Sequence, residues 1–188
     1  MKNKFSLIGI GIAILIIIMW GIATHNRLIA MEGNIDGHWA QIENNLQRRY
    51  DLIPNLVATV KGYAEHEEEV FTQIAQARAQ LAGAANINET SEASRNIESA
   101  LSRLLAIAEN YPELKANQGF LDLQVELAGT ENRLAVSRMD YNNSVKDYNI
   151  TIKSIPTKFI ANFMGFSSKS FFEISNNARE NVEVNFNN

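Results

Sequence analysis

The chain has 188 residues, of which 46% are hydrophobic and 20% are charged, and this balance is ordinary for one folded domain. It contains no cysteine, so a disulfide framework, a thiolate nucleophile and a sulfur-ligated metal site are excluded. Three of the 17 basic residues fall within the first 27 positions, which leaves 14 basic against 21 acidic side chains in residues 28–188, a net charge of −7. Such an acidic domain is not expected to bind nucleic acid, whose phosphates require clustered positive charge.

The first element in chain order is the uncharged segment FSLIGIGIAILIIIMWGIA at residues 5–23. As a helix it would span roughly 28 Å, close to the thickness of a bilayer core, with Trp20 near one end, where interfacial aromatics are favoured. A cleaved signal peptide is the alternative, because Gly21-Ile22-Ala23 resembles a cleavage site, but signal h-regions usually run about 7–15 residues. We therefore predict a membrane anchor at residues 1–27, which contacts the lipid bilayer through residues 5–23, and a soluble domain at residues 28–188.

The charges that flank this segment bear on its orientation. Lys2 and Lys4 precede it, and Arg27 follows it closely. Since Lys and Arg are more frequent on the cytoplasmic side, the difference of one charge favours a cytoplasmic N-terminus. The sequence thus predicts a single-pass protein of the cell membrane whose soluble domain faces outward.

After the anchor, apolar residues recur at alternating spacings of four and three, which is typical of one continuous helical seam over about six heptads. Gly33 and Gly37 weaken the start of this helix, so its link to the anchor is expected to flex. Two positions of the seam, Arg49 and Glu67, are charged. The apolar positions are Ile35, Trp39, Ile42, Leu46, Ile53, Leu56, Val60, Tyr63, Val70, Ile74, Ala77 and Leu81.

Two further helices are expected. The small and polar segment GAANINETSEAS at residues 83–94 predicts a loop, with Asn88, Thr90 and Ser91 as candidate helix caps. Pro112 either bends the second helix or reverses the chain, and the third helix begins near Asn117 and ends before Pro156. The second stripe is Ile97, Leu101, Leu104, Ala108 and Tyr111, and the third is Phe120, Leu123, Leu127, Leu134, Tyr141, Val145, Tyr148 and Ile152.

Amphipathic helices are marginal in water alone and must bury their stripes against one another. The predicted fold is therefore all-α: an antiparallel up-and-down bundle of about four helices, preceded by one N-terminal transmembrane helix. The heptad repeat of Tyr141-Asn142 and Tyr148-Asn149 places both tyrosines on one face, where a core edge with satisfied hydroxyl groups is expected and a partner-binding face is the alternative.

The C-terminal tail is rich in aromatic residues. In a short helix, Phe159, Ile160, Phe163 and Met164 would share one side, and we expect this side to cover the open end of the bundle. A helix that lies on the membrane is the alternative, although such helices normally carry more Lys and Arg. Only VEVNF, at residues 182–186, shows the alternation of a strand. The remaining tail aromatics are Phe166, Phe171, Phe172 and Phe186.

The stretch RRYDLIPNL, at residues 48–56, places a proline and adjacent arginines within a helical seam. Pro54 cannot donate to the Tyr50 carbonyl, so a helix that continues through it is expected to bend. Arg49 lies on the seam, so either it meets a carboxylate across the bundle, for which the candidates are Glu109, Glu126 and Glu131, or the seam is hydrated there. The pair either fixes the register of the bundle or belongs to a ligand-binding pocket at the bend.

Chemistry is otherwise sparse. The stretch EHEEE at residues 65–69 favours a solvated acidic face, because His66 has no second histidine within helical reach and metal sites usually need three or four convergent ligands. The chain has no Gly-rich phosphate loop, G-x-S-x-G or H-E-x-x-H motif. We therefore predict no catalytic residues, no cofactor and no metal site.

Three long blocks resemble the LemA family: RRYDLIPNLVATVKGYAEHE (48–67), AIAENYPELKANQGFLDLQVELAGTENRLAVSRMDYNNSVKDYN (106–149) and FMGFSSKSFFE (163–173). The resemblance extends from about residue 28 to the C-terminus. It implies a membrane-anchored, up-and-down helical bundle, and it carries over no catalytic residues. The matching signature positions are Arg48, Arg49, Asp51, Pro54, Asn55, Glu109, Tyr111, Pro112, Lys115, Asn117, Glu131, Arg138, Tyr141 and Asn142.

These observations predict a membrane-tethered, non-enzymatic scaffold or interaction protein, whose partner is an unknown protein or a second copy that associates along the long helix. The alternative is a ligand-sensing or hydrolase-like site at the Pro54 bend. The candidate functional cluster consists of Arg48, Arg49, Asp51, Asn55, Glu109, Glu131 and Arg138.

Overall fold

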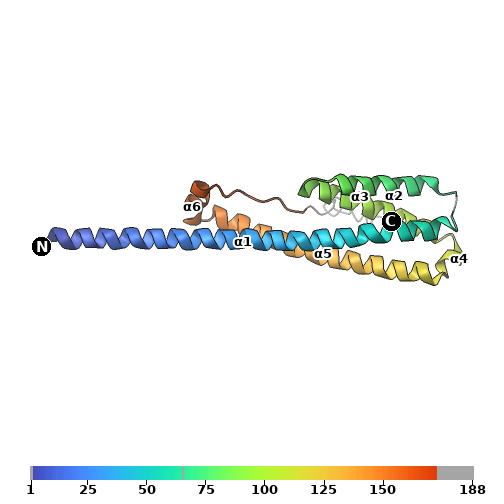
Figure 1. Cartoon of the computed structure of the whole chain (residues 1–188), viewed down its shortest axis with the longest axis horizontal. Coiled ribbons are helices and arrows are strands. Elements are labelled where there is room, and N and C mark those ends of the chain that lie inside the picture. Colours follow the sequence, from blue (N-terminus) through green and yellow to red (C-terminus); the bar gives the residue numbers. More distant parts are fainter. Residues whose placement is uncertain (1, 65, 173–188) are drawn as a thin grey trace, which may run out of the picture. The chain divides into compact units, whose positions relative to one another are not determined.

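The computed structural model describes residues 2–64 and 66–172, and for residues 2–7 it describes the backbone alone. All regular secondary structure within these residues is helical, as Figure 1 shows, which confirms the predicted all-α class. The helices are α1 (Lys2–Lys61), α2 (Glu68–Gly83), α3 (Ile87–Ala108), α4 (Pro112–Lys115), α5 (Gln118–Lys153) and α6 (Thr157–Met164). The expected alternation of VEVNF, together with Phe186, lies outside the described residues.

The chain divides into two compact units. Of the described residues, 2–41 and 139–170 form the first, which we call the anchor unit, and 42–64, 66–138 and 171–172 form the second, the bundle unit. Helices α1 and α5 each run through both units without a break. α1 therefore continues through Gly33 and Gly37, where a flexible link was expected. The predicted division at residue 27 falls inside this helix and stays a prediction about where the chain leaves the membrane.

The described part of the bundle unit consists of four long helical segments, from α1, α2, α3 and α5, and the short α4 around one core. Arg48 of α1 contacts Glu126 of α5, whereas Asn45, one turn earlier, contacts Ser137, so the two helices run in opposite directions. α2 and α3 are likewise antiparallel, because Gln73 pairs with Arg103 and Gln80 with Asn96. Tyr63 of the predicted seam is 38% exposed. The seam residues that lie in this core are Ile53, Leu56, Val60, Val70, Ile74 and Ala77. Ile97, Leu104, Leu114 and Phe120 are further members that are fully buried.

The predicted continuous helix through Leu81 is wrong at one point: α1 ends at Lys61, and the chain reverses before α2 begins at Glu68. The backbone N–H of Ala64 still donates to Val60 at 3.0 Å, and both residues are buried at the turn. Glu68 and Glu69 then occupy the first turn of α2, where acidic side chains favour a helix start. The apolar positions of α2 happen to follow those of α1 in the same heptad register, because each helix turns its apolar side to the core. The spacing of apolar residues in the sequence therefore gave no sign of the reversal.

The loop between α2 and α3 is shorter than expected, and its predicted caps are wrong. Asn86 is the N-cap: its Oδ1 accepts from the backbone N–H of Glu89 at 3.0 Å, and the Glu89 carboxylate accepts from the Ala85 N–H at 2.8 Å. This reciprocal arrangement resembles a capping box. Thr90 and Ser91 lie inside α3 and are buried.

Pro112 opens the short helix α4 between α3 and α5, and the chain reverses there. A proline suits the first turn of a helix, because the N–H that it lacks would have no helical partner. The start of α5 is fixed by Asn117, whose Oδ1 accepts from the Phe120 N–H at 3.0 Å and whose Nδ2 donates to the Tyr63 hydroxyl at 3.1 Å. The predicted start near Asn117 is confirmed.

In the anchor unit, the second half of α5 packs antiparallel to α1 and holds the chain that follows α6. Tyr148 donates to Glu32 at 3.1 Å, and Tyr141 donates to the carbonyl of Ser170 at 2.9 Å. The side chain of Asn149 both donates to and accepts from the backbone of Lys169, each at 2.9 Å. Both tyrosines are therefore a buried core edge with satisfied hydroxyl groups, as predicted.

The expected cover of the bundle by the aromatic side of the tail is wrong for α6. Phe159 and Phe163 are 68% and 88% exposed, and Met164 is also exposed. Ala161, on the opposite side of α6, is the residue that is buried. Phe172, farther along, is buried in the bundle unit over the guanidinium of Arg138. Among the described tail aromatics, Phe172 is the one buried in the bundle unit, whereas α6 packs against Gly21 of α1 through Ile160 and leaves Phe159 and Phe163 uncovered.

Candidate functional site

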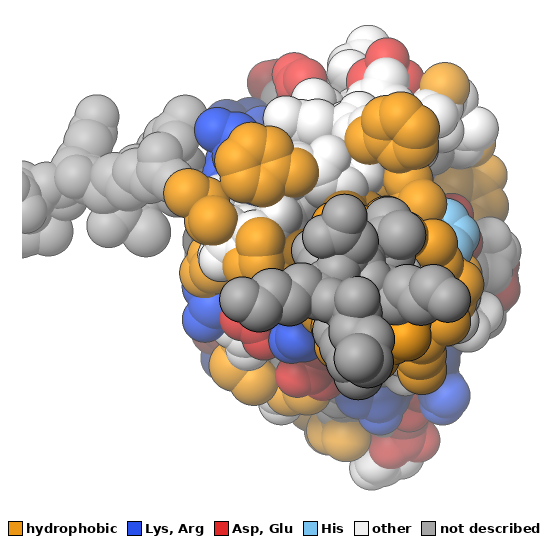
Figure 2. All heavy atoms as spheres, turned by 90° about the vertical axis from the view of Figure 1, so that its left-hand side faces the viewer, with side chains coloured by type: hydrophobic (Ala, Val, Ile, Leu, Met, Phe, Trp, Pro, Cys, Tyr) orange, Lys and Arg blue, Asp and Glu red, His pale blue; other side chains and the backbone are white. Residues whose placement is uncertain are grey.

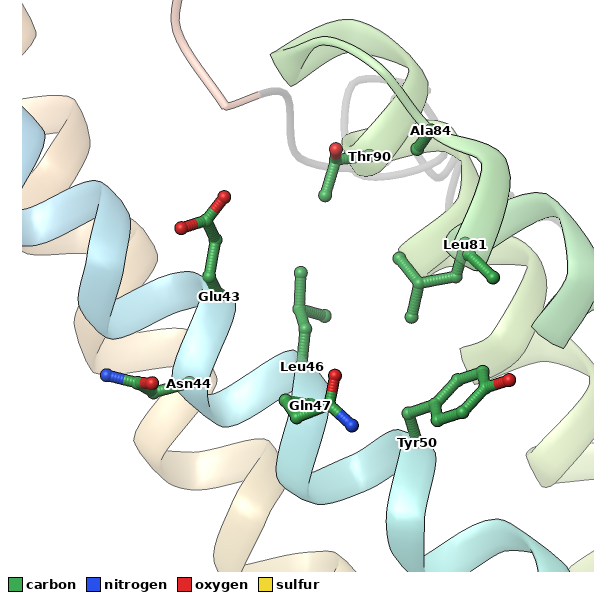
Figure 3. Close-up of a pocket in the computed structure, with 9 residues that line it drawn as sticks. Glu43, Asn44, Leu46, Gln47, Tyr50, Leu81, Ala84 and Thr90 are labelled. Carbon is green, nitrogen blue, oxygen red and sulfur yellow. The ribbon is translucent and has the colours of Figure 1, made fainter.

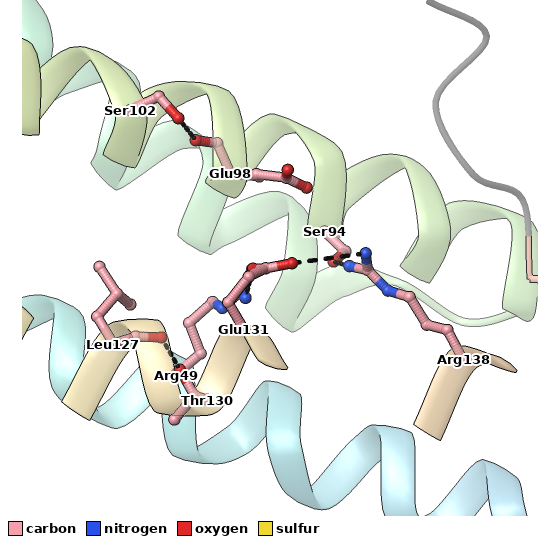
Figure 4. A network of polar contacts seen from close by, with 8 residues as sticks. All are labelled: Arg49, Ser94, Glu98, Ser102, Leu127, Thr130, Glu131 and Arg138. Carbon is pink, nitrogen blue, oxygen red and sulfur yellow. Dashed lines mark hydrogen bonds and ion pairs between the residues drawn. The ribbon is translucent and has the colours of Figure 1, made fainter. Parts of the chain in front are cut away.

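A cluster of charged side chains lies inside the bundle unit, where α1, α3 and α5 meet (Figure 4). Arg49 of α1 is 1% exposed and forms an ion pair with Glu131 of α5. Arg138, two turns farther along α5, lies 3.9 Å from the other oxygen of Glu131 and donates to the Ser94 hydroxyl of α3 at 2.6 Å. Glu131 thus lies between two arginines.

Burial and mutual repulsion affect both guanidinium groups. Burial, together with the charge of Arg138, lowers the pKa of Arg49 to about 10, and the charge of Glu98 acts in the opposite direction. Burial also lowers the pKa of Arg138, again against the effect of Glu98. Both groups remain cationic at neutral pH, so the unit retains two inward positive charges, which Glu131 and Glu98 compensate.

The hydrogen-bonding capacity of the Arg49 guanidinium is only partly satisfied. Among the described residues, its Nε and Nη1 atoms have no hydrogen-bond partner, although both are buried. The same side chain lines a groove of about 240 Å³ between α3 and α5. The other lining residues include Glu98, Ser102, Gln124 and Glu131. Donors without partners at the wall of a groove can bind water or a polar ligand.

The other predicted site residues do not join this cluster. Arg48 binds Glu126 on the surface, and Asp51 accepts from Gln47 at 2.8 Å, one turn away on α1. Asn55 is exposed, and Glu109 pairs with Lys115 at 2.6 Å. Of the three carboxylates considered for Arg49, Glu131 is the partner. The predicted set therefore separates into one buried cluster and several surface pairs.

Sequence reasoning missed Ser94 and Glu98, which α3 contributes to the cluster. The signal was present for Ser94, because the stripe of α3 extended backward by a spacing of three from Ile97 reaches that position. Ser94 is indeed fully buried. The role of Glu98 could not have been found in this way, because it is an exposed residue that acts on Arg49 and Arg138 through its charge alone.

A second groove of the bundle unit, of about 610 Å³, lies between α1 and the end of α2 (Figure 3). Leu46 and Leu81 face each other across it, and Glu43 and Thr90 lie at its outer side. Tyr50 at its other end lies 4.1 Å below the guanidinium of Arg78. Its lining combines amides, small apolar residues and one carboxylate, and it contains no nucleophile beside a base.

Of the EHEEE stretch, His66 lies in the turn between α1 and α2 and Glu69 in the first turn of α2, and both are exposed. Glu65 is not among the described residues. Within residues 2–64 and 66–172, no group of three His, Asp or Glu side chains is placed to hold a metal ion.

Near its N-terminal end, α1 is long and apolar enough to cross a membrane. Its large apolar side chains from Ile8 to Met19 are all more than half exposed to the surroundings of the chain. A helix surface of this kind requires an apolar environment or a covering partner.

Comparison with known proteins agrees with this architecture. The chain is 24% identical to the protein LemA of Metamycoplasma hominis over 85% of its own length and 73% of that protein. It is 23% identical to the magnetosome protein MamQ of Magnetospirillum gryphiswaldense and to MamQ 1 of Paramagnetospirillum magneticum, over 79% of its own length. The match spans 64% of the length of these magnetosome proteins.

The model of the LemA family matches residues 38–186, which include the bundle unit, the second half of α5 and α6. Neither the name of the family nor those of the relatives states an enzymatic activity. The chain belongs to the LemA family.

Proposed function

We propose that this protein is a membrane-anchored, non-enzymatic interaction protein: the first part of α1 spans the bilayer, and the bundle unit presents a surface to another protein. The anchor is supported by the exposed apolar side chains of α1 between Ile8 and Met19. The charges of Lys2 and Lys4 favour a cytoplasmic N-terminus and a bundle unit that faces outward.

The observation that carries the interaction role is an apolar stripe on the outer face of α5. Leu121, Val125 and Val136 are 39%, 73% and 54% exposed, and their spacing places them on one side of the helix. Ala128 and Ala135 are exposed on the same side, as is the polar Asn132 between them. Single exposed apolar residues are ordinary on a protein surface, whereas an aligned row of them is typical of an interaction surface.

The seam of α1, first considered for self-association, is not available for it. Ile42, Leu46 and Ile53 are between 0% and 4% exposed, because they already pack inside the chain. The α5 stripe is therefore the surface that we assign to a partner or to a second copy.

Photo-crosslinking in native membranes tests this proposal. A photoreactive phenylalanine at position 125 of the full chain should give an adduct with a second copy or another protein, and Val136→Glu should reduce its yield several-fold. Ala75→Glu, on an exposed position of α2, is the matched control and should leave the yield unchanged. Recovery of the uncrosslinked chain alone would contradict the proposal.

A ligand-sensing site is the second candidate, and the partnerless donors of Arg49 at the 240 Å³ groove favour it. The hydrolase-like form of this idea loses its basis, since Arg48 and Asp51 are engaged elsewhere. A small polar ligand that binds Arg49 should raise the unfolding temperature of the wild-type chain and not that of Arg49→Met. Identical shifts in both proteins would exclude Arg49 from the binding.

A further inference from the structure

Helix α6 lies beside the end of the apolar segment of α1. Ile160 packs against Gly21, with its Cδ1 atom 3.9 Å from the position that a Cβ would take there. Just after α6, the ring of Phe166 lies 5.6 Å from that of His25. These residues all belong to the anchor unit, so the position of α6 along α1 is fixed within one compact body. α6 is therefore at the level of Gly21, next to the interfacial residue Trp20.

The side of α6 that turns away from α1 is strongly apolar and uncovered. Phe159 and Phe163 lie one helical turn apart and are 68% and 88% exposed. Ile155, just before the helix, is 77% exposed. Figure 2, which looks along the chain from the N-terminal end of α1, shows hydrophobic side chains gathered around that helix on this face. Large aromatic side chains with such exposure are costly in water.

Three exposed basic side chains near α6 are suited to contact the phosphates of a lipid surface. Lys158 on α6 and Lys153 at the end of α5 are exposed, as is Arg27 on α1, one and a half turns beyond Gly21. Basic side chains at this level can reach lipid phosphates while the aromatic rings enter the boundary between head groups and acyl chains.

We propose that α6 is an interfacial helix that inserts Phe159 and Phe163 into the same bilayer that the first part of α1 spans. The occupant of this apolar face is thus the lipid surface, with which α6 is continuous through its contact with the anchor. This inference rests on the anchor of the proposed function and goes beyond it, because it assigns a second, peripheral membrane contact. The anchor unit would then be fixed in tilt and rotation, which one spanning helix alone does not fix.

Site-directed spin labelling tests the inference, and the absence of cysteine from the chain makes every label unique. The full chain is reconstituted in vesicles of equimolar phosphatidylcholine and phosphatidylglycerol with one label at Phe163→Cys, Ile12→Cys or Met139→Cys. Position 12 lies in the anchor, and Met139 is an exposed residue on α5 of the same unit. Accessibility to oxygen, which partitions into lipid, is compared with accessibility to a water-soluble nickel chelate.

The label at 163 should show a several-fold higher ratio of oxygen to nickel accessibility than the label at 139. Its ratio should be closer to that of the lipid-embedded label at 12 than to that of the label at 139. A ratio at 163 equal to that at 139 would overturn the interfacial helix while the value at 12 still supports the anchor. A label at 163 that both reagents fail to reach would indicate a protein contact and would also overturn it. A water-exposed label at 12 would reject the anchor, and the inference with it.

Discussion

At the residue scale, Arg49 is a charged side chain held in the interior of the bundle unit. It is buried and paired with Glu131, and its neighbour Arg138 has the same charge. Replacement of a buried ion pair by apolar side chains is often neutral, whereas truncation of one partner is strongly destabilising. The effects of side-chain size and of charge at position 49 on the free energy of unfolding can therefore be measured separately with two substitutions.

We expect Arg49→Ala to lower the free energy of unfolding by about 3 kcal/mol, because it creates a cavity and removes the pair. Arg49→Met should change it by less than about 1 kcal/mol, because it fills the space, relieves the repulsion with Arg138, and leaves a Glu131 side chain that is 38% exposed and can be hydrated. Urea unfolding of the full chain in detergent micelles, followed by circular dichroism, measures both. Equal losses in the two variants would show that the charge, and not the packing, stabilises the bundle.

Tyr148 predicts a dependence of stability on alkaline pH. Burial, the hydrogen bond to Glu32 and the charge of Glu32 together raise the pKa of Tyr148 to about 12. An unfolded tyrosine loses its proton near pH 10, so between about pH 10 and 12 the folded state binds more protons than the unfolded state. The contribution of Tyr148 is thus complete below about pH 10 and is lost as the pH rises through that window.

Tyr148→Phe should therefore weaken the fall in unfolding free energy between about pH 9 and pH 12, by roughly 1–2 kcal/mol. Tyr141, whose pKa burial also raises to about 12, retains its own share of the fall in this variant. Denaturant titrations at a series of pH values provide the measurement. A variant with the same pH dependence as the wild type would refute the assignment.

At the element scale, the start of α3 depends on a cap that lies earlier in the chain than the sequence pattern indicated. Asn86→Ala should lower the free energy of unfolding by about 1 kcal/mol, because the Glu89 N–H loses its acceptor. Asn88→Ala, at the exposed position that was first considered as a cap, is the matched control and should have little effect. Chemical denaturation of both variants decides between the two positions, and a larger effect at Asn88 would reject the observed cap.

Features that depend on a pattern within a single helix were the easiest to predict. The stripe Ile97, Leu101 and Leu104 repeats within one helix, and all three residues are buried as expected. The reversal after Lys61 and the exposure of Phe163 were not predictable in this way. A helical period reports which side of a segment is apolar, and it does not report what covers that side or where the chain turns.

At the scale of the whole molecule, the proposed anchor predicts how the chain behaves in cells. The full chain should stay in the membrane pellet after an alkaline carbonate wash, and its intact mass should include residues 1–27. Ile14→Arg with Ile17→Arg should release it or prevent its insertion, since each charge at the centre of a spanning helix costs about 2.5–3.5 kcal/mol. A mature mass that begins after Ala23 would instead show that the segment is a cleaved signal peptide.

The sequence by itself determined the apolar segment at residues 5–23, the helical class and the buried side of the long bundle helices, because all of these follow from local composition and period. It also placed Arg49 as a charge on the apolar seam, to be either paired with a carboxylate or hydrated. Tertiary structure alone decided that Glu131, and neither Glu109 nor Glu126, is that carboxylate, and that Ser94 and Glu98 complete the cluster. It likewise decided that α6 packs on α1 through Ile160 and leaves Phe163 uncovered. These choices depend on contacts between segments far apart in the chain, which no local pattern encodes.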